Sequence, residues 1–436
     1  MTIDNKEKFR VSIIGGGLGG LALAQMLKSN PRLQVVVYER SSTDKDPLTG
    51  YRIQMEAQAL EGLKAHTSAE VAAGIEASIG YQPVGGQLLG FMDARRKKML
   101  ASWYPPAMRT MKSVNRWLLR DALIIDTGSV LELGKRFSHY KEVEDGPVRL
   151  FFTDGTHEEC DLLVGADGVR SMVRQQLLPN IKVRESGIGV TYFKVPYTSE
   201  TQGLLPFGTG VAAFCGNNQV ITIHSWVNPK QKWAVQCSPD VLDPDQSFIM
   251  LGLGSEVCRY KEQARHPEAL TPPELREEVR RRISEQRVDP IFTELIDRVI
   301  VNSAYSNVLK LSDTPARWNN DRVTLIGDST MNMSPYTGKG ASLAFADAMA
   351  LAKVLETETF FTCPETKTKL MSAYVEDMLR RRKKQRKGGV FIQRVVFSGK
   401  NVVKVAARDN FLRCYNVLGH GIEGLQKPFA SSKIAT

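Results

Sequence analysis

The chain lacks long apolar runs and paired cysteine motifs, and each absence excludes a class of protein. No stretch reaches the roughly 18 apolar residues that a membrane-spanning helix requires. The six cysteines are scattered without a CxxC pair, so we expect neither a disulfide framework nor a metal site. Residues 1–10 are polar and charged, which predicts no secretory segment there and a cytoplasmic location.

The composition is that of an ordinary large globular protein, with 42% hydrophobic and 24% charged residues among 436. A chain of this length can bury a large core, in one large domain or two interleaved ones. Part of the net charge of +11 lies in Arg380 to Lys387, RRRKKQRK. A solvated helix end is the favoured interpretation of this run. Nuclear targeting, nucleic acid and an anionic membrane surface are the less favoured alternatives, so we expect no nucleic-acid partner.

The N-terminal segment has the order of a dinucleotide-binding unit. Apolar residues Val11 to Ile14 predict a strand, a helix follows, and Leu33 to Tyr38 predict a second strand ending at Glu39. Between the first strand and the helix is a G-x-G-x-x-G loop, formed by Gly15, Gly17 and Gly20. Such glycines permit a tight turn and close approach of a pyrophosphate, and an acid at this distance can bind a ribose.

Two later segments repeat the pattern of a strand, small residues, a carboxylate and a helix. Asp161 to Val164 are followed by Asp167 and Gly168, and Val323 to Ile326 by Gly327 and Asp328. A glycine-containing loop then precedes a helix that we expect over Ala341 to Leu355. A strand that enters a glycine-rich loop and a helix N-terminus favours phosphate binding, because free backbone N–H groups face the anion.

Residues from about 180 to 310 are rich in strand patterns, with helices expected over Pro272 to Gln286 and Pro290 to Val299. Such a sheet is a plausible wall for a substrate pocket. His224 and Trp226 alternate with Thr222 on one strand face, although core packing is the more common role of such residues. The expected strands are Gly187 to Val195, Val211 to Phe214, Val220 to Val227, Trp233 to Cys237 and Ser247 to Leu251. Helical stretches are also expected over Lys367 to Lys387 and over Val390 to Leu418. The second is expected to cap the core, with a membrane or a partner as alternatives.

Together the three nucleotide-type segments resemble the single-component (group A) FAD-dependent monooxygenases of the aromatic-hydroxylase family, from about residue 10 to 355. Met333-Ser334-Pro335 and Glu185-x-Gly187 look most like the tetracycline-inactivating monooxygenases and their fungal and bacterial relatives. The chain departs from the family at Ser329-Thr330-Met331 and at Lys339, where polar surroundings of the flavin differ.

The resemblance implies an α/β fold: a Rossmann-like FAD-binding domain of the GR2 type, an interleaved β-sheet substrate domain and C-terminal helices. Residues 1–180 and 300–360 would form the FAD-binding domain, and some substrate-side strands could come from 50–115. Residues 181–299 would form the β-rich domain and 361–436 the helical region.

The resemblance also implies roles for individual residues. FAD would contact Gly15, Gly17, Leu18, Gly19, Gly20, Glu39, Arg40, Arg52, Gln54, Arg116, Asp167, Asp328, Pro335, Gly338, Gly340 and Ala341. Arg116 read alone fits a surface arginine equally well. Substrate would contact Tyr192, Phe214, His224, Trp226 and Pro335, and His224 or Tyr192 would serve as a catalytic base towards a phenol.

The function implied is insertion of one oxygen atom from O2 into a phenolic, indolic or polyketide-like molecule, in specialised metabolism or xenobiotic modification. NADPH or NADH would reduce FAD, and a flavin C4a-hydroperoxide would transfer the oxygen. Epoxidation, Baeyer–Villiger insertion and a plain oxidase stay open. Halogenation is disfavoured because Trp226 and Trp233 do not form a Trp-x-Trp-x-Ile-Pro stretch. A Rab-escort-like binding protein is disfavoured by the intact Asp167-Gly168 and Gly327-Asp328 motifs.

Overall fold

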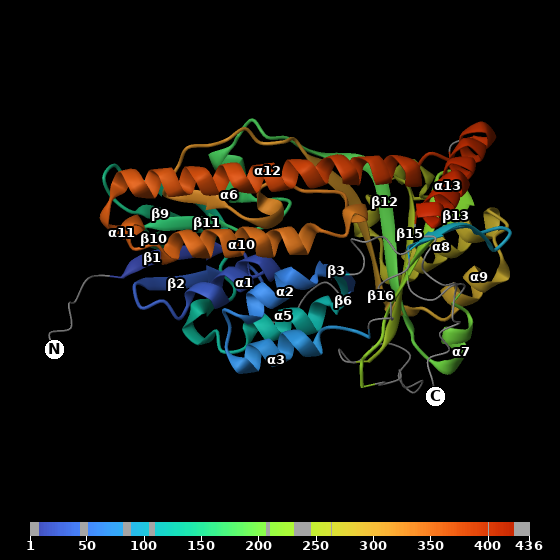
Figure 1. The fold of residues 1–436 in the computed structure, drawn as a ribbon, viewed down its shortest axis with the longest axis horizontal. Coiled ribbons are helices and arrows are strands. Elements are labelled where there is room, and N and C mark those ends of the chain that lie inside the picture. Colours follow the sequence, from blue (N-terminus) through green and yellow to red (C-terminus); the bar gives the residue numbers. More distant parts are fainter. Residues whose placement is uncertain are drawn as a thin grey trace.

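The computed structural model describes residues 8–43, 51–81, 89–103, 110–205, 210–230, 246–262, 264–399 and 401–422. The expected strand over Trp233 to Cys237 lies outside these ranges. Figure 1 shows two parts side by side, a parallel sheet with its helices on the left and a large mixed sheet on the right. Within the described ranges, every helix is too short or too polar to cross a membrane.

The parallel sheet carries all three glycine-containing segments. Its strand order is β17–β11–β1–β2–β7, and each neighbouring pair is parallel. Because the strands run in one direction, the loops after β1, β11 and β17 leave from the same edge. The strands are β1 (Phe9–Ile14), β2 (Leu33–Tyr38), β7 (Leu131–Glu132), β11 (Leu162–Gly165) and β17 (Val323–Leu325).

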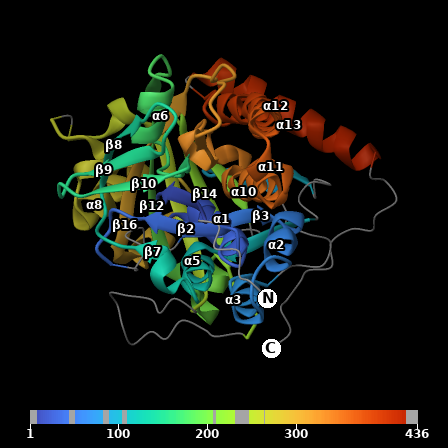
Figure 2. The ribbon, with the colours of Figure 1, turned by 90° about the vertical axis from the view of Figure 1, so that its left-hand side faces the viewer.

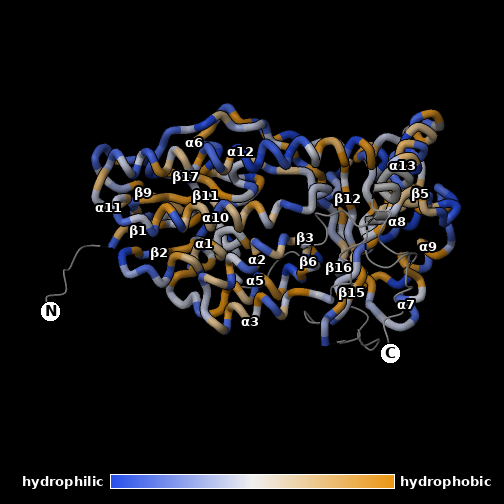
Figure 3. Tube along the Cα trace, in the orientation of Figure 1, coloured by the Kyte–Doolittle hydropathy of each residue, from blue (hydrophilic) through white to orange (hydrophobic). Residues whose placement is uncertain are grey.

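Both faces of the parallel sheet are covered, which explains its continuous apolar strands. Helices α1 (Leu18–Leu27) and α10 (Gly340–Glu356) pack together in the core with it. Figure 2 shows α10 and α2 on one flank and a small antiparallel sheet on the other. That small sheet has the order β10–β9–β8. Figure 3 shows hydrophobic residues along the strands of the parallel sheet. The further elements here are α2 (Ala57–Lys64), α3 (Ala69–Ala77), α5 (Arg116–Ile124), α6 (Met172–Leu177), β8 (Phe137–Glu142), β9 (Val148–Phe152) and β10 (His157–Cys160).

The large sheet has the strand order β16–β12–β15–β14–β13–β4–β5, antiparallel except between β13 and β4. One face packs in a core with helices α8 (Pro272–Glu285) and α9 (Pro290–Asp297). Since side chains alternate along a strand, the other face carries Tyr192, Thr222 and His224. The bounds are β4 (Leu89–Asp93), β5 (Lys98–Trp103), β12 (Val183–Pro196), β13 (Val211–Gly216), β14 (Gln219–Trp226), β15 (Phe248–Glu256) and β16 (Ile300–Ser312), with α7 (Ser199–Gly203) after β12.

The chain crosses between the two parts more often than the sequence suggests. Residues 300–312, expected in the FAD-binding part, form β16 and pair with β12 in the large sheet. Strands β4 and β5 reach the same sheet from within residues 50–115. Strand β10 precedes β11 as a separate element and was not expected. A hydropathy pattern predicts that a segment is a strand, but it does not predict which strand lies beside it. Pairing between strands that are far apart in the sequence therefore could not be predicted.

A short antiparallel ribbon joins the two parts. It consists of β3 (Arg52–Glu56) and β6 (Met111–Asn115), and Figure 1 shows it between the parallel sheet and the large sheet. Asn115 caps α5 by accepting hydrogen bonds from the backbone N–H groups of Trp117 and Leu118. This cap fixes the start of α5 beside the ribbon, so Arg116 lies at the junction of the two parts.

The last helices cover both parts. Helix α12 (Pro364–Val396) continues beyond the expected end at Lys387, after the short α11 (Thr359–Thr362). It buries residues three or four apart, including Met371, Val375 and Met378, which is the pattern of one packed face. Helix α13 (Val402–Ile422) is a separate element and packs against β5, whereas a continuous stretch was expected.

The basic run in α12 contains a buried ion pair. Arg382 and Asp347 of α10 are both 0% exposed, and the Arg382 Nη2 atom lies 2.6 Å from Asp347 Oδ2. The same carboxylate oxygen accepts a hydrogen bond from the Gly327 N–H group at 3.1 Å. The interpretation of the run as a solvated helix end is therefore wrong for Arg382, although Arg380 does project into solvent. Charge alone could not reveal a partner that lies 35 residues earlier.

We predict that Asp347→Asn lowers the free energy of unfolding by about 3 kcal/mol or more, because it leaves the buried Arg382 without a counter-ion. Urea unfolding followed by circular dichroism measures this. The matched control is Glu376→Gln, whose carboxylate pairs with Arg317 at the surface, with an expected change below about 1 kcal/mol. Equal effects of the two substitutions would contradict the prediction that the buried ion pair contributes more to the free energy of unfolding than a surface pair.

Candidate active site

The loop after β1 has two glycines required for packing and one that faces open space. Gly15 has φ of +113°, and a Cβ there would lie 2.5 Å from the Ala166 carbonyl oxygen. A Cβ on Gly20 would overlap the Gly15 carbonyl oxygen. A Cβ on Gly17 would meet nothing within 4 Å, although Gly17 directly precedes the N-terminus of α1. The open side of Gly17 therefore offers backbone N–H groups to an anion.

Glu39 fastens this loop to the end of β2. Its Oε2 atom accepts a hydrogen bond from the Gly16 N–H group at 2.7 Å, and Oε1 accepts one from the Ser41 N–H group at 2.9 Å. The Arg120 Nε–H group donates to the Gly16 carbonyl oxygen at 3.3 Å. The neighbouring Arg40 is exposed. Glu39 thus sits beside the glycine loop with both oxygens partly engaged by backbone.

The second loop, after β11, holds a carboxylate with one unused oxygen. Asp167 Oδ2 accepts hydrogen bonds from the Met172 and Val173 N–H groups at 2.7 and 3.3 Å. Its Oδ1 atom is buried and has no hydrogen-bond partner among the described residues. Burial raises the pKa of the Asp167 carboxyl. A buried acceptor without a donor is costly, so this oxygen is suited to a donor from a bound group.

The third loop, after β17, is tied to the second by one arginine. Arg174 donates hydrogen bonds to the carbonyl oxygens of Ser329 at 2.9 Å and Val169 at 2.6 Å. Burial raises the pKa of the neighbouring Asp328 carboxyl, while Arg382 and Arg174 act in the opposite direction. The two carboxylates of the second and third loops are thereby held at one edge of the parallel sheet.

The end of the third loop meets the ribbon and opens α10. Gly338 has φ of +61°, and a Cβ there would lie 2.7 Å from Gln54 Oε1. Lys339 pairs with Glu56 at 2.9 Å, which explains how a lysine is accommodated at this position. Pro335 is exposed, Ala341 is half-buried, and a Cβ on Gly340 would meet nothing within 4 Å. The start of α10, like that of α1, leaves space beside its backbone.

Two arginines lie at the junction of the two sheets. Arg52 is buried and its Nε–H group donates to Ser113 Oγ at 2.9 Å. The Arg116 guanidinium lies 5.6 Å from the ring centre of Tyr51. Burial lowers the pKa of both arginines to about 10. Arg116 is half-buried, so it is not the surface arginine that the sequence allowed.

A cluster of tyrosines lies next to Arg116 on the large sheet. The ring centres of Tyr192 and Tyr305 are 5.2 Å apart, and Tyr51 lies 6.4 Å from Tyr192 and 5.8 Å from Tyr305. Burial raises the pKa of Tyr192 to about 12 and that of Tyr51 and Tyr305 further. These phenols are therefore protonated near neutral pH and act as hydrogen-bond donors rather than as bases.

His224 lies on the same face of the large sheet and is also poorly suited to hold a proton. Its Nδ1 atom is buried and has no hydrogen-bond partner among the described residues. Burial, together with the positive charge of Arg52, lowers the pKa of His224 to about 3. The imidazole is neutral near pH 7. Its Nδ1 atom can therefore donate a hydrogen bond to a ligand or accept one from it, depending on the tautomer.

The other predicted substrate residues are packed more tightly. Trp226 is 0% exposed, and its indole N–H group donates to the Ser78 carbonyl oxygen at 3.1 Å. Phe214 is buried beneath the Arg408 guanidinium, which lies 3.7 Å from its ring centre. Both residues belong to hydrophobic clusters that pack against the large sheet. Core packing is the role that the sequence favoured for Trp226.

Several residues of this region were not predicted. Tyr51 and Tyr305 join Tyr192, and Tyr336 of the third loop lies against β15, where a Cβ on Gly254 would be 3.0 Å from the Tyr336 hydroxyl oxygen. Tyr51 directly precedes Arg52, a predicted cofactor residue, so its place near the site could have been predicted from the sequence. Tyr305 lies in a segment assigned to the other domain, so no local pattern pointed to it.

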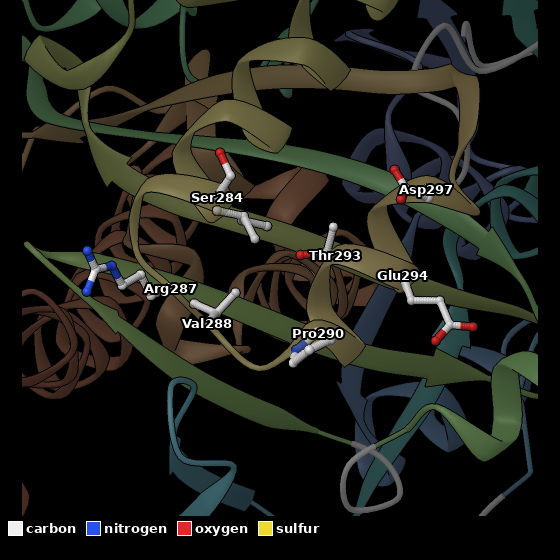
Figure 4. Close-up of a pocket in the computed structure, with 8 residues that line it drawn as sticks. Ser284, Arg287, Val288, Pro290, Thr293, Glu294 and Asp297 are labelled. Carbon is white, nitrogen blue, oxygen red and sulfur yellow. The ribbon is translucent and has the colours of Figure 1, made fainter.

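A separate hollow of about 480 Å³ lies between α8 and α9 (Figure 4). These helices pack on the opposite face of the large sheet from Tyr192 and His224. The hollow is therefore not part of the candidate site. It is lined by Ile283, Ser284, Arg287, Val288, Pro290, Thr293, Glu294 and Asp297. Among the described residues, no three potential metal ligands gather anywhere.

The loop residues fit a large anionic dinucleotide cofactor. Gly17 and Gly340 leave open space at two helix N-termini, and Asp167 Oδ1 is an unused buried acceptor. Arg116 lies where the loops meet the tyrosine cluster. An extended ligand with a pyrophosphate at one end and a planar ring at the other matches this distribution of groups.

Comparison with known proteins identifies the family. A profile described as FAD binding domain matches residues 8–384. The FAD-dependent monooxygenase thnD of Trichoderma harzianum is 27% identical over 366 residues, which is 79% of this chain and 82% of that protein. The 6-methylsalicylate 1-monooxygenase atA of Aspergillus terreus is 26% identical, over 82% of this chain and 77% of that protein. The dual O-methyltransferase/FAD-dependent monooxygenase elcB of Phaeosphaeria nodorum is 27% identical, but the match spans 40% of its length and 80% of this chain.

Solved structures agree on the fold. A protein from Photorhabdus luminescens described as an FAD containing monooxygenase has a TM-score of 0.73 and 26% identity, covering 90% of this chain and 98% of that one. The tetracycline destructase Tet(51) has a TM-score of 0.62 over 97% of this chain and 100% of that one, and at 18% identity it shows the fold alone. The predicted fold class and the predicted resemblance to FAD-dependent monooxygenases are confirmed. The chain therefore belongs to the FAD binding domain family, its cofactor is FAD, and its relatives are FAD-dependent monooxygenases.

Proposed function

We propose that this protein uses NAD(P)H and O2 to insert one oxygen atom into an electron-rich small molecule of phenolic, indolic or polyketide-like character. The observation that carries the proposal is the contact of the third loop with one face of the large sheet, next to Arg116. Tyr336 of the third loop lies against β15, and Arg116 lies against Tyr51 beside Tyr192. A planar ring held by the loops would therefore face the side chains of that sheet.

The loops would divide the cofactor between them. The N-terminus of α1 beside Gly17 would hold the pyrophosphate and Glu39 the adenosine ribose, with Asp328 on the ribityl side. Arg52, Gln54 and Arg116 would lie along the ring system, which is bounded by Gly340 and Ala341. When bound, FAD supplies hydride acceptance from the nicotinamide and activation of O2.

The remaining side chains would position the substrate and exclude water. Tyr51, Tyr192 and Tyr305 form an aromatic wall whose protonated hydroxyls can donate hydrogen bonds to substrate oxygens. His224 offers a neutral ring nitrogen to a substrate hydroxyl group and orients it, rather than storing a proton. Exclusion of water matters because the reactive oxygen is otherwise lost as hydrogen peroxide.

The relatives support an aromatic or polyketide substrate, since the name of the Aspergillus terreus enzyme specifies 6-methylsalicylate. The same fold permits epoxidation, Baeyer–Villiger insertion or plain oxidation. The mass of the product separates these outcomes in part, because an oxygenase adds one oxygen atom and an oxidase only removes hydrogen.

We predict that purified protein loaded with FAD oxidises NADPH faster in the presence of a phenolic or indolic substrate than without one. With isotope-labelled O2, mass spectrometry of the product should show one labelled oxygen atom. Hydrogen peroxide in amounts equal to the NADPH consumed, with every tested compound left unlabelled, would contradict the proposed reaction and favour an oxidase.

Two glycine substitutions should separate cofactor binding from folding. Gly17→Ala places its methyl group in open space, so we expect unchanged unfolding of the cofactor-free protein but a loss of FAD affinity of about tenfold or more. Gly20→Ala forces its methyl group against Gly15, so the cofactor-free protein itself should lose about 1–3 kcal/mol. Fluorescence titration with FAD and urea unfolding measure the two effects. Undiminished FAD affinity in Gly17→Ala would contradict the placement of the pyrophosphate.

His224 should affect kcat, but its own protonation should not appear as an inflection in the pH profile of kcat. Because its pKa is about 3, the imidazole stays neutral from about pH 5 to 9. His224→Phe removes the ring nitrogen, so we expect kcat to fall by about tenfold or more while the pH profile keeps its shape. His224→Gln, which keeps a polar group, should recover part of the loss. An inflection near the ordinary histidine pKa that disappears in both variants would show instead that His224 gains and loses the proton.

A further inference from the structure

Lys194 is a buried cation on the proposed substrate face. It lies two residues after Tyr192 on β12, so its side chain leaves the sheet on the same face. In the sheet register Lys194 stands opposite Met250, which stands opposite His224 on the next strand. Tyr192, Lys194 and His224 therefore share one face, and only 7% of the Lys194 surface is exposed.

The surroundings of Lys194 are aromatic and provide no counter-ion. Its Nζ atom lies 4.7 Å from the ring centre of Phe248 and 5.5 Å from that of Trp117. Within the described part of the chain no carboxylate forms an ion pair with it, and burial alone lowers its pKa to about 8. Aromatic faces attract an ammonium group, but they replace only part of the hydration that burial removes. A buried cation in this state gains most from a bound anion.

The charged groups near Lys194 also favour binding of an anion. Trp117 directly follows Arg116, and Arg52 acts on His224 across the same region. One acidic group, Asp328 of the third cofactor loop, acts on Tyr51. The junction thus combines two buried cations, Lys194 and Arg52, and the half-buried Arg116 with protonated tyrosines. The two arginines lie towards the cofactor loops and the ribbon, whereas Lys194 belongs to the large sheet.

We infer that Lys194 is an anion-binding residue of the substrate site and that the substrate carries an anionic oxygen, as a carboxylate or an acidic phenol or enol. This rests on the proposed function, because it assumes that the tyrosine and histidine face holds the substrate. The ammonium group would pair with the anionic oxygen at one end of the substrate. The neutral His224 would take a hydroxyl group one strand further across the sheet.

Binding of matched pairs of compounds to the FAD-loaded protein tests the inference. Benzoate and benzamide differ in charge but little in shape, and pentafluorophenol and pentafluoroanisole provide the corresponding pair for a phenolate. Calorimetry gives each Kd. We expect at least one anion to bind roughly ten- to hundredfold more tightly than its neutral partner.

Substitutions then assign the preference to one group. Lys194→Met keeps the length of the side chain without its charge, and it should abolish the preference while leaving the neutral compounds and FAD content unchanged. Lys194→Arg should retain the preference in large part. The matched control is Lys182→Met, an exposed lysine just before β12, which should behave as wild type.

Three outcomes would overturn the inference: no preference for an anion in the wild-type protein, a preference that survives in Lys194→Met, or loss of FAD in Lys194→Met. The last would assign the ammonium group to the cofactor. Failure of the proposed function is seen separately, as absence of labelled oxygen in products although anions bind through Lys194. If anions bind and oxygen is incorporated only into neutral compounds, the anion site is not the substrate site and the inference fails alone.

Discussion

The buried ion pair between Asp347 and Arg382 connects the elements on which the proposed site depends. Asp347 belongs to α10, Arg382 to α12, and the Gly327 N–H group of the third loop donates to the same carboxylate. A charged pair without exposure has to be geometrically complete, because the loss of either partner leaves an unpaired charge in the core. The pair therefore fixes the loop, the helix that follows it and the helix above it as one unit.

From that anchor α12 extends to the large sheet. A Cβ on Gly389 would overlap Thr337 of the third loop, so the helix packs directly on the loop that would bound the flavin. Phe397, just past the end of α12, contacts Tyr336 with ring centres 5.6 Å apart, and both lie against Gly254 of β15. A single helix thus joins the cofactor loop to the substrate face. Val396 and Leu412 pack in one hydrophobic cluster with residues of the large sheet, in line with the expectation that Val390 to Leu418 cap the core.

The electrostatics of the junction follow from burial. Arg52, Arg116 and Lys194 all have lowered pKa values because water is excluded, and the tyrosines beside them have raised ones. The cations still carry their charge near neutral pH, but burial makes that charge costly, so a bound anionic cofactor and an anionic substrate oxygen would stabilise the charged forms. The same exclusion of water is what oxygen transfer from a flavin requires.

Local signals in the sequence were sufficient for the three cofactor loops and the strands that precede them. The loop after β1, Asp167 and Asp328 each follow an apolar strand, and parallel strands bring such loops to a common edge. Partners across long distances were not readable. Tyr305 comes to Tyr192 only because β16 pairs with β12, and Arg382 meets Asp347 only when α12 folds back over α10. Lys194 resembled an ordinary strand lysine, since nothing in its neighbours along the chain indicates burial between Trp117 and Phe248.

The measurement that tests the central claim most directly is the visible absorption spectrum of the purified protein after it is loaded with FAD and separated from free FAD. If the three loops form one cofactor site, the spectrum should show an oxidised-flavin band that corresponds to one FAD per chain. Addition of NADPH without oxygen should then bleach that band, and air should restore it. A protein that is colourless after loading and removal of free FAD, with its fold intact by circular dichroism, would show that the loops build the fold without binding the cofactor, and the proposed oxygenation would fall with it.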